Sequence, residues 1–166
     1  MFQRILLAID DSPGSEMATA FAGALATRDG GSVHVFHVTE HLVSGWGTTW
    51  HKRDNAMELV TTTVEQLADV GVWADGSSSV AASRRVANRI AETALARGCD
   101  AIVLGSQRQR RFGRIFSRRV RERTTLLSLL PVLIAPSPLS RIPAGVSFHQ
   151  VTEADVAQPL ATPSSS

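Results

Sequence analysis

Short apolar runs alternate with longer amphipathic stretches over the first 136 residues of the chain. A continuous apolar run bounded by turn or acidic residues is typical of a strand buried on both faces of a parallel sheet. Five runs meet this description, at residues 4–10, 33–38, 72–74, 101–104 and 131–136. The third is the weakest, and a run of small residues follows it at 75–79.

Apolar residues in the segments between these runs recur at helical spacing. Met17, Phe21 and Leu25 show the pattern in the first segment, and such a stripe predicts an amphipathic helix. Pro13 suits the first turn of that helix, and a glycine at position 30 suits its end. The helices are predicted from Pro13 to Gly30, from Met57 to Gly71, from Val86 to Gly98 and from about Arg114.

Strands that alternate with helices imply right-handed crossovers. The predicted fold class is therefore α/β, with an open, doubly wound, five-stranded parallel sheet and helices on both faces. Residues 39–55 are predicted to form a loop, in which Trp46 and Trp50 either pack over the domain or anchor a partner.

The chain divides into a domain and an appendage. Residues 1–136 form one predicted α/β domain. Residues 137–166 are rich in Pro, Ser, Ala and Thr and are predicted to form a mobile tail, with a docked segment as the alternative.

The composition predicts a protein with a folded core and without a membrane helix. Hydrophobic residues make up 43% of the 166 residues, which is enough for a real core. No apolar run reaches the length of a membrane helix, and the N-terminus lacks a signal-peptide pattern. Cys99 is the single cysteine, which fits a reducing compartment and a small core thiol. We therefore expect a cytoplasmic protein without membrane insertion.

Basic residues gather in one segment. The formal net charge is only +2, yet residues 105–123, GSQRQRRFGRIFSRRVRER, hold eight arginines against one glutamate. The segment follows the apolar run at 101–104, and a strand that enters a loop and then a helix is where α/β proteins hold anionic ligands. The arginines therefore create a local positive field at the predicted ligand-binding edge of the sheet.

Three segments carry a resemblance to a known family. They are ILLAIDDSPGSEMA at the first strand and helix, HVFHV at the second strand, and CDAIVLGSQ followed by a basic helix and LLPVLIAP. In this order and spacing, the chain resembles the universal stress protein family over about residues 1–136. The resemblance implies an adenine nucleotide alpha hydrolase-like fold.

The resemblance also points to a ligand motif. ATP-binding members of that family carry a glycine, two residues, a second glycine, nine residues, a third glycine and a serine or threonine. Here Gly105 keeps the first position, whereas arginines occupy the other three. By resemblance, the residues that would contact a nucleotide or another anion are Asp10, Val38, Gly105, Ser106, Arg108, Arg118, Arg119 and Val120. ATP or another nucleotide stays a candidate ligand, and no cofactor follows from the residues themselves.

Arginines in place of glycines have two opposite outcomes. Glycine lets backbone N–H groups approach a phosphate, so long side chains at these positions would block a triphosphate. Alternatively, the guanidinium groups line the cleft and bind an anion through their side chains. Asp10 also has two interpretations, because it either contacts the nucleotide or caps the following helix.

Helical spacing assigns the side chains of the basic helix. The predicted buried stripe is Phe116, Val120, Leu127 and Leu130, opposite a solvated side with Arg114, Arg118 and Arg121. Arg119 and Arg123 fall close to the stripe, where an unpaired charge is costly. They must extend to solvent, meet a ligand or pair with an acid. An Arg119–Asp10 pair would close the ligand site from inside.

Other chemistries have weaker support. The histidines His34, His37, His41 and His51 lack the cysteines or clustered carboxylates that complete a metal site. Ser12, Asp10 and these histidines do not form a nucleophile–base arrangement. Nucleic-acid binding is not favoured, because no binding signature accompanies the arginines and only Phe112 and Phe116 interleave with them.

The leading hypothesis is a non-enzymatic regulatory protein of universal stress type that has lost conventional ATP binding. By resemblance, it forms a homodimer through the last strand, at residues 131–136, and acts through a protein partner. The alternative is a binding module for a nucleotide or another phosphorylated anion held by Arg108, Arg118 and Arg119. A slow ATPase has the least support, because the loop has lost its glycines and no general base is evident.

Overall fold

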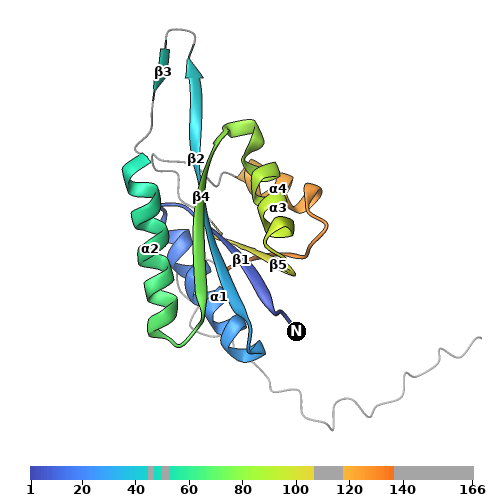
Figure 1. Ribbon diagram of the computed structural model, residues 1–166. Helices are drawn as coiled ribbons and strands as arrows, with labels where there is room; N and C mark the ends of the chain where they lie inside the picture. Colours follow the sequence, from blue (N-terminus) through green and yellow to red (C-terminus); the bar gives the residue numbers. More distant parts are fainter. Residues whose placement is uncertain (45–46, 50–52, 107–117, 137–166) are drawn as a thin grey trace, which may run out of the picture.

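The computed structural model describes residues 1–44, 47–49, 53–106 and 118–136, with backbone alone for the described residues between 41 and 54 (Figure 1). Its elements in chain order are β1 (Arg4–Ile9), α1 (Pro13–Asp29), β2 (Ser32–Ser44), β3 (Gly47–Thr49), α2 (Arg53–Asp69), β4 (Ala74–Ala82), η1 (Ser83–Arg85), α3 (Val86–Ala96), β5 (Ala101–Leu104), α4 (Arg118–Leu127) and β6 (Val132–Ile134). The predicted tail at 137–166 lies outside the described residues.

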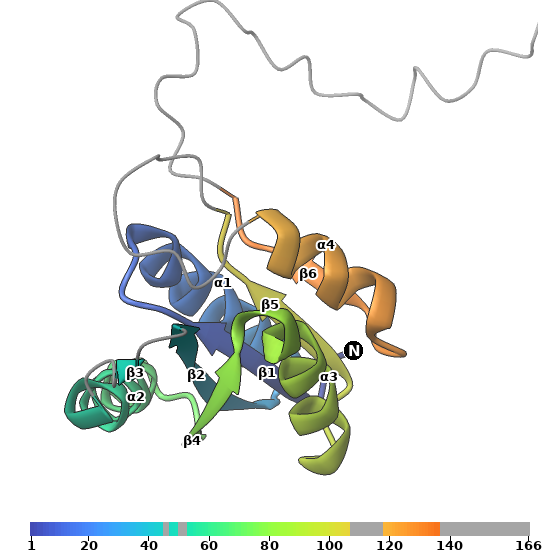
Figure 2. The ribbon, with the colours of Figure 1, turned by 90° about the horizontal axis from the view of Figure 1, so that it is seen from above.

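Five parallel strands form the sheet that the sequence predicts, in the order β4, β2, β1, β5 and β6. The short strand β3 pairs with the end of β2 in the antiparallel direction. Helices α1 and α2 cover one face of the sheet, and α3 and α4 cover the other (Figure 2). The predicted doubly wound α/β architecture is confirmed.

The apolar runs become central strands because both of their faces are covered. In β1, residues 5 to 9 alternate between the core under α1 and α2 and the core under α3 and α4, and none is more than 1% exposed. All of β5 is buried in the same way. Cys99 lies in the second core, where burial raises the pKa of its thiol to about 11, so the predicted core thiol is confirmed.

Two predictions about the region around β2 and β4 were wrong. The third strand is not residues 72–74 but Ala74–Ala82, so the small-residue run that we expected to follow the strand is the strand itself. The predicted loop at 39–55 contains the last part of β2, the strand β3 and the start of α2. Strand β4 is longer than predicted because it pairs with β2 along nine residues, from Val33↔Ala74 to His41↔Ala82. The rest of β2 pairs with β3, from Leu42↔Thr49 to Ser44↔Gly47. Trp46 and Trp50 lie outside the described residues.

Helix α4 buries a narrower stripe than predicted. Val120 is buried as expected, but Leu127 is 44% exposed, and Thr124 occupies the second buried position. The Thr124 hydroxyl donates a hydrogen bond of 2.8 Å to the Val120 carbonyl, so its polar group is satisfied inside the helix. Leu130 packs partly buried against the core, as predicted, whereas Phe116 lies outside the described residues.

Candidate functional site

The candidate site lies where β1 and β5 end side by side. These adjacent parallel strands lead to helices on opposite faces, since β1 is followed by α1 and the next helix after β5 is α4. Such a switch point at the carboxyl ends of the strands is where open α/β sheets bind ligands. The two segments that meet here are residues 10–15 and Gly105–Ser106.

Asp10 is a buried acid that organises the start of α1. Its side chain is 1% exposed, and its Oδ1 accepts hydrogen bonds from the Ser12 hydroxyl, from the Ser12 backbone N–H at 3.1 Å and from the Ser15 hydroxyl at 2.8 Å. The Asp10 backbone N–H in turn donates to Ser15 Oγ at 2.8 Å. These contacts hold the segment that leads into α1, whereas the N-cap of that helix is Ser12. Whether Asp10 also contacts a nucleotide stays a prediction.

Gly105 contacts the start of α1 through its backbone. A Cβ at Gly105 would lie 2.6 Å from the carbonyl oxygen of Gly14, and a Cβ at Gly14 would lie 3.3 Å from the carbonyl oxygen of Ser106. No side chain fits at the first of these distances without a backbone shift. The one position of the nucleotide motif that keeps its glycine therefore needs glycine for packing against the first turn of α1, whatever ligand is bound.

The remaining predicted site residues divide into core and surface. Val38 and Val120 are buried, 0% and 6% exposed, in the core under α3 and α4. Arg118 and Arg119 lie exposed at the start of α4, and Arg118 Nε is 2.6 Å from Glu122 Oε1. Arg108 lies outside the described residues. The structure thus brings Asp10, Gly105 and Ser106 to one edge, while the Arg119–Asp10 pair stays a prediction.

Comparison with known proteins identifies the family of this chain. The sequence profile of the universal stress protein family matches residues 1–136. The chain belongs to this family. The comparison with curated proteins found no significant match.

Solved structures of universal stress proteins share the fold. One from Burkholderia pseudomallei has 20% identity and a TM-score of 0.64, covering 81% of this chain and 96% of its own. One from Archaeoglobus fulgidus, in complex with dAMP, has 23% identity and a TM-score of 0.61, covering 81% and 98%. A third, in complex with cAMP, has 17% identity and a TM-score of 0.60, covering 80% and 95%.

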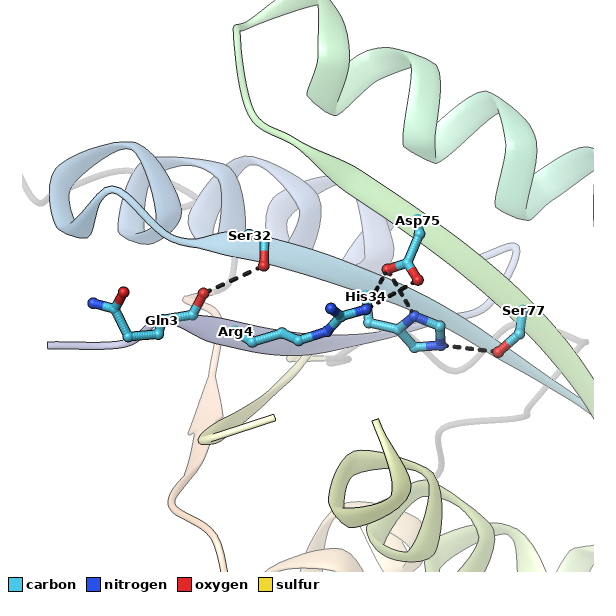
Figure 3. Close-up of polar contacts among 6 residues, drawn as sticks. All are labelled: Gln3, Arg4, Ser32, His34, Asp75 and Ser77. Atoms are coloured by element: carbon cyan, nitrogen blue, oxygen red, sulfur yellow. Dashed lines mark hydrogen bonds and ion pairs between the residues drawn. The ribbon is translucent and has the colours of Figure 1, made fainter. Parts of the chain in front are cut away.

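This universal stress protein has a second polar cluster, at the opposite end of its strands (Figure 3). Arg4 Nη2 lies 3.0 Å from both carboxylate oxygens of Asp75. His34 Nδ1 is 2.9 Å from Asp75 Oδ1, and His34 Nε2 is 2.9 Å from Ser77 Oγ. The cluster joins β1, β2 and β4, and sequence reasoning missed it, because it depends on the register His34↔Asp75 between two distant strands.

The hydrogen bonds of this cluster select the tautomer of a neutral His34. A neutral ring with its proton on Nδ1 donates to Asp75 and accepts from the Ser77 hydroxyl, which satisfies all three groups. Burial lowers the pKa of His34, and Asp75 opposes that shift without reversing it. The ring is therefore neutral near pH 7.

Ser77, His34 and Asp75 follow the order of a nucleophile, a base and an acid. The environment differs from that of a hydrolase, because His34 is completely buried and Asp75 is also bound by the guanidinium of Arg4. We therefore infer that the cluster has a structural role, because it links β1, β2 and β4 near the starts of these strands. The part of the chain that the structure describes contains no cluster of three or more His, Cys, Asp or Glu side chains that could hold a metal ion. None of its described helices combines the length and the hydropathy of a membrane span.

Proposed function

We propose that this member of the universal stress protein family is a non-enzymatic regulatory protein that has lost conventional ATP binding. The observation that carries the proposal is the packing of Gly105 against Gly14. Three of the four motif positions are arginines, and the fourth has a structural reason to remain glycine. The glycine retained at the first motif position therefore does not by itself argue for phosphate binding through the backbone.

Thermal unfolding with ligands tests this proposal. We expect millimolar ATP to leave the melting temperature of the native chain unchanged, since a ligand stabilises a protein only by binding its folded state. The variant Arg108→Gly, Arg118→Gly, Arg119→Ser restores the motif, and we expect it to gain an ATP-dependent rise. A ligand at a hundredfold excess over its Kd stabilises by about 2.7 kcal/mol, so the effect would be plain. A clear shift of the native chain with ATP would refute the proposal.

The alternative function is the binding of a different phosphorylated anion through arginine side chains. It is supported by the exposure of Arg118 and Arg119 at the start of α4, the next described element after Gly105 and Ser106. Solved relatives are described in complex with dAMP and with cAMP. The same thermal experiment therefore includes ADP, AMP, cyclic nucleotides and pyrophosphate, and a shift with one of these but not with ATP favours the alternative.

We further propose that the protein forms a homodimer through the free edge of β6. Among the described residues, β6 pairs with β5 alone. The Ala135 N–H and the Pro131 carbonyl bond to β5, so strand alternation turns the N–H groups of Val132 and Ile134 outward. The side chain of Ile134 is 42% exposed and that of Leu129, just before the strand, is 87% exposed. An unpaired edge beside apolar surface suits strand pairing with a second copy.

Ile134→Pro tests the dimer. Proline removes the outward N–H of Ile134 without removing a bond to β5, so we expect a monomer whose melting temperature stays close to that of the native chain. Ile134→Ala keeps the N–H and should remain dimeric. Light scattering after size exclusion measures both. A native chain that is monomeric, or an Ile134→Pro variant that still dimerises, would contradict pairing through β6.

A further inference from the structure

The two helical layers of the molecule carry opposite charge. Helices α1 and α2 together contain six acidic residues and two arginines, whereas η1, α3 and α4 together contain seven arginines and two glutamates. The layers lie on opposite faces of the sheet (Figure 2). The formal net charge of +2 therefore conceals a strong separation of charge across the molecule.

The arginines of the positive layer are directed to solvent. Six of them are exposed, and we call this group the basic face: Arg84, Arg85, Arg89, Arg118, Arg119 and Arg123. Two have acidic neighbours, with Arg118 Nε 2.6 Å from Glu122 and Arg89 Nη1 3.7 Å from Glu92. Within the described part of the chain, no ion pair joins the other four to a carboxylate.

Helix stability does not explain this placement. Arg118 and Arg119 open α4, Arg84 and Arg85 directly precede α3, and neither helix has an acid in its first turn. Cations in the first turn oppose the helix dipole. Arg118 and Arg119 therefore oppose the dipole of α4, and Arg85, the N-cap of α3, adds a cation at a second helix start, although Arg84 and Arg85 also end η1. A local preference broken in α4 indicates a role outside the helix.

Most exposed apolar side chains of this layer lie toward the helix ends. Leu95 is in the last turn of α3, Leu126 and Leu127 end α4, and Leu129 follows it. Five of the six arginines lie instead in η1 or in the first turns of α3 and α4, and only Arg123 has exposed leucines, Leu126 and Leu127, at helical spacing. A lipid surface would require apolar groups among the cations, and protein interfaces have an apolar centre. The basic face fits a hydrophilic polyanion better than either.

We propose that the basic face docks the phosphate backbone of a double-stranded nucleic acid. Helices packed about 8–10 Å apart spread the arginines over more than one phosphate, and guanidinium groups match phosphate geometry. The elements η1, α3 and α4 contain no aromatic residue on which single-stranded bases could stack. Binding is therefore independent of sequence and sensitive to salt.

The structure adds arginines from another part of the sequence to the basic segment. The basic segment that is evident in the sequence lies between residues 105 and 123. The fold brings Arg89 onto a helix that packs against α4, while Arg84 and Arg85 lie in η1, which contacts α3, β2 and β4 on the way into that helix.

Fluorescence anisotropy with two unrelated 25-base-pair DNA duplexes, and with an RNA duplex of equal length, tests the proposal. For the native chain we expect a similar Kd for the two DNA sequences, roughly micromolar to a hundred micromolar at physiological salt, and weaker binding as salt increases. The variant Arg84→Gln, Arg85→Gln, Arg119→Gln, Arg123→Gln should weaken binding at least about tenfold and flatten the dependence on salt.

A variant with the same change of net charge on the acidic layer is the matched control. Thr61→Glu, Thr62→Glu, Gln66→Glu, Ala68→Glu alters exposed positions on α2, and we expect less than about a threefold change in Kd. Both variants must melt like the native chain. Three outcomes would each overturn the proposal: no duplex binding at 50 mM salt, an equal loss in the control, or tighter binding to anionic vesicles than to duplex. Complete displacement of duplex by millimolar pyrophosphate at constant ionic strength would also overturn it, in favour of a small-anion site.

Discussion

Gly105→Ala is expected to destabilise the protein by about 3 kcal/mol, enough to unfold a marginal domain. The added Cβ would lie 2.6 Å from the carbonyl oxygen of Gly14 and 2.8 Å from its carbonyl carbon. These are backbone atoms, so the clash is relieved only if the start of α1 moves away from the turn after β5. That movement disturbs the hydrogen bonds of Asp10 with Ser12 and Ser15. Urea denaturation of the purified variant measures the loss.

Gly14→Ala is the matched control for this prediction. Its Cβ would lie 3.3 Å from the Ser106 carbonyl oxygen, a tight contact that a small adjustment relieves. Gly14 is in the first turn of α1, and alanine recovers part of the cost through its better helix propensity. We expect a change within about 1 kcal/mol. If Gly105→Ala is as stable as Gly14→Ala, the packing explanation for the retained glycine is wrong, and its role as a ligand loop regains support.

The motif alone does not explain why Gly105 is retained. In sequence, one glycine out of four positions resembles the remnant of a phosphate loop. In the structure, the backbone of Gly105 packs against the first turn of α1, at Gly14. The contact partner, Gly14, cannot be identified from the motif, since it lies in α1, the helix that follows the other strand at the switch point.

Central strands were predictable because burial on both faces requires continuous apolar runs. Strands β1 and β5 illustrate this, and their positions agree with the sequence within one residue. Edge strand β4 was not predictable in the same way. Its sequence, ADGSSSVAA, is poor in residues with high strand propensity, and its pairing with β2 overrides that preference. Small residues also have a packing reason here, since a Cβ at Gly76 would lie 2.3 Å from Val60 on α2.

The candidate site was predictable only in part. Strand order and resemblance together placed Asp10, Gly105 and Ser106 at one edge, where the structure has them. The side chains of the basic helix were less accessible to sequence reasoning. Helical spacing cannot tell how wide the buried stripe is, so Leu127 was assigned to the core, where Thr124 lies instead. The cluster of Arg4, His34 and Asp75 could not be found without the register of β2 and β4.

Asp75→Ala is expected to lower the free energy of unfolding by about 2 kcal/mol. The change removes the acceptor for the Arg4 guanidinium and for Nδ1 of the buried His34. The side chains of Arg4 and Asp75 are 29% and 33% exposed, so water reaches the pair and the loss is smaller than for a fully buried one. Urea denaturation at pH 7.5 measures it.

Glu122→Ala removes a solvent-exposed ion pair and is the control for Asp75→Ala. Arg118 and Glu122 are 86% and 54% exposed, and we expect no measurable change in the free energy of unfolding. If both variants lose the same stability, the cluster has no special role and Asp75 is an ordinary surface acid.

The pH dependence of stability provides a second signature of the cluster. Burial lowers the pKa of His34 below its ordinary value of 6.5, so the unfolded chain binds more protons than the folded one as pH falls below that value. Stability is therefore complete above about pH 6.5 and decreases as pH falls toward the lower pKa of the folded state. His34→Gln removes the titrating ring, and we expect its stability to change less between pH 7.5 and 5.5. An equal pH slope in the native chain and in His34→Gln, or a native chain that becomes more stable as pH falls through this window, would show that His34 is not held neutral by its burial.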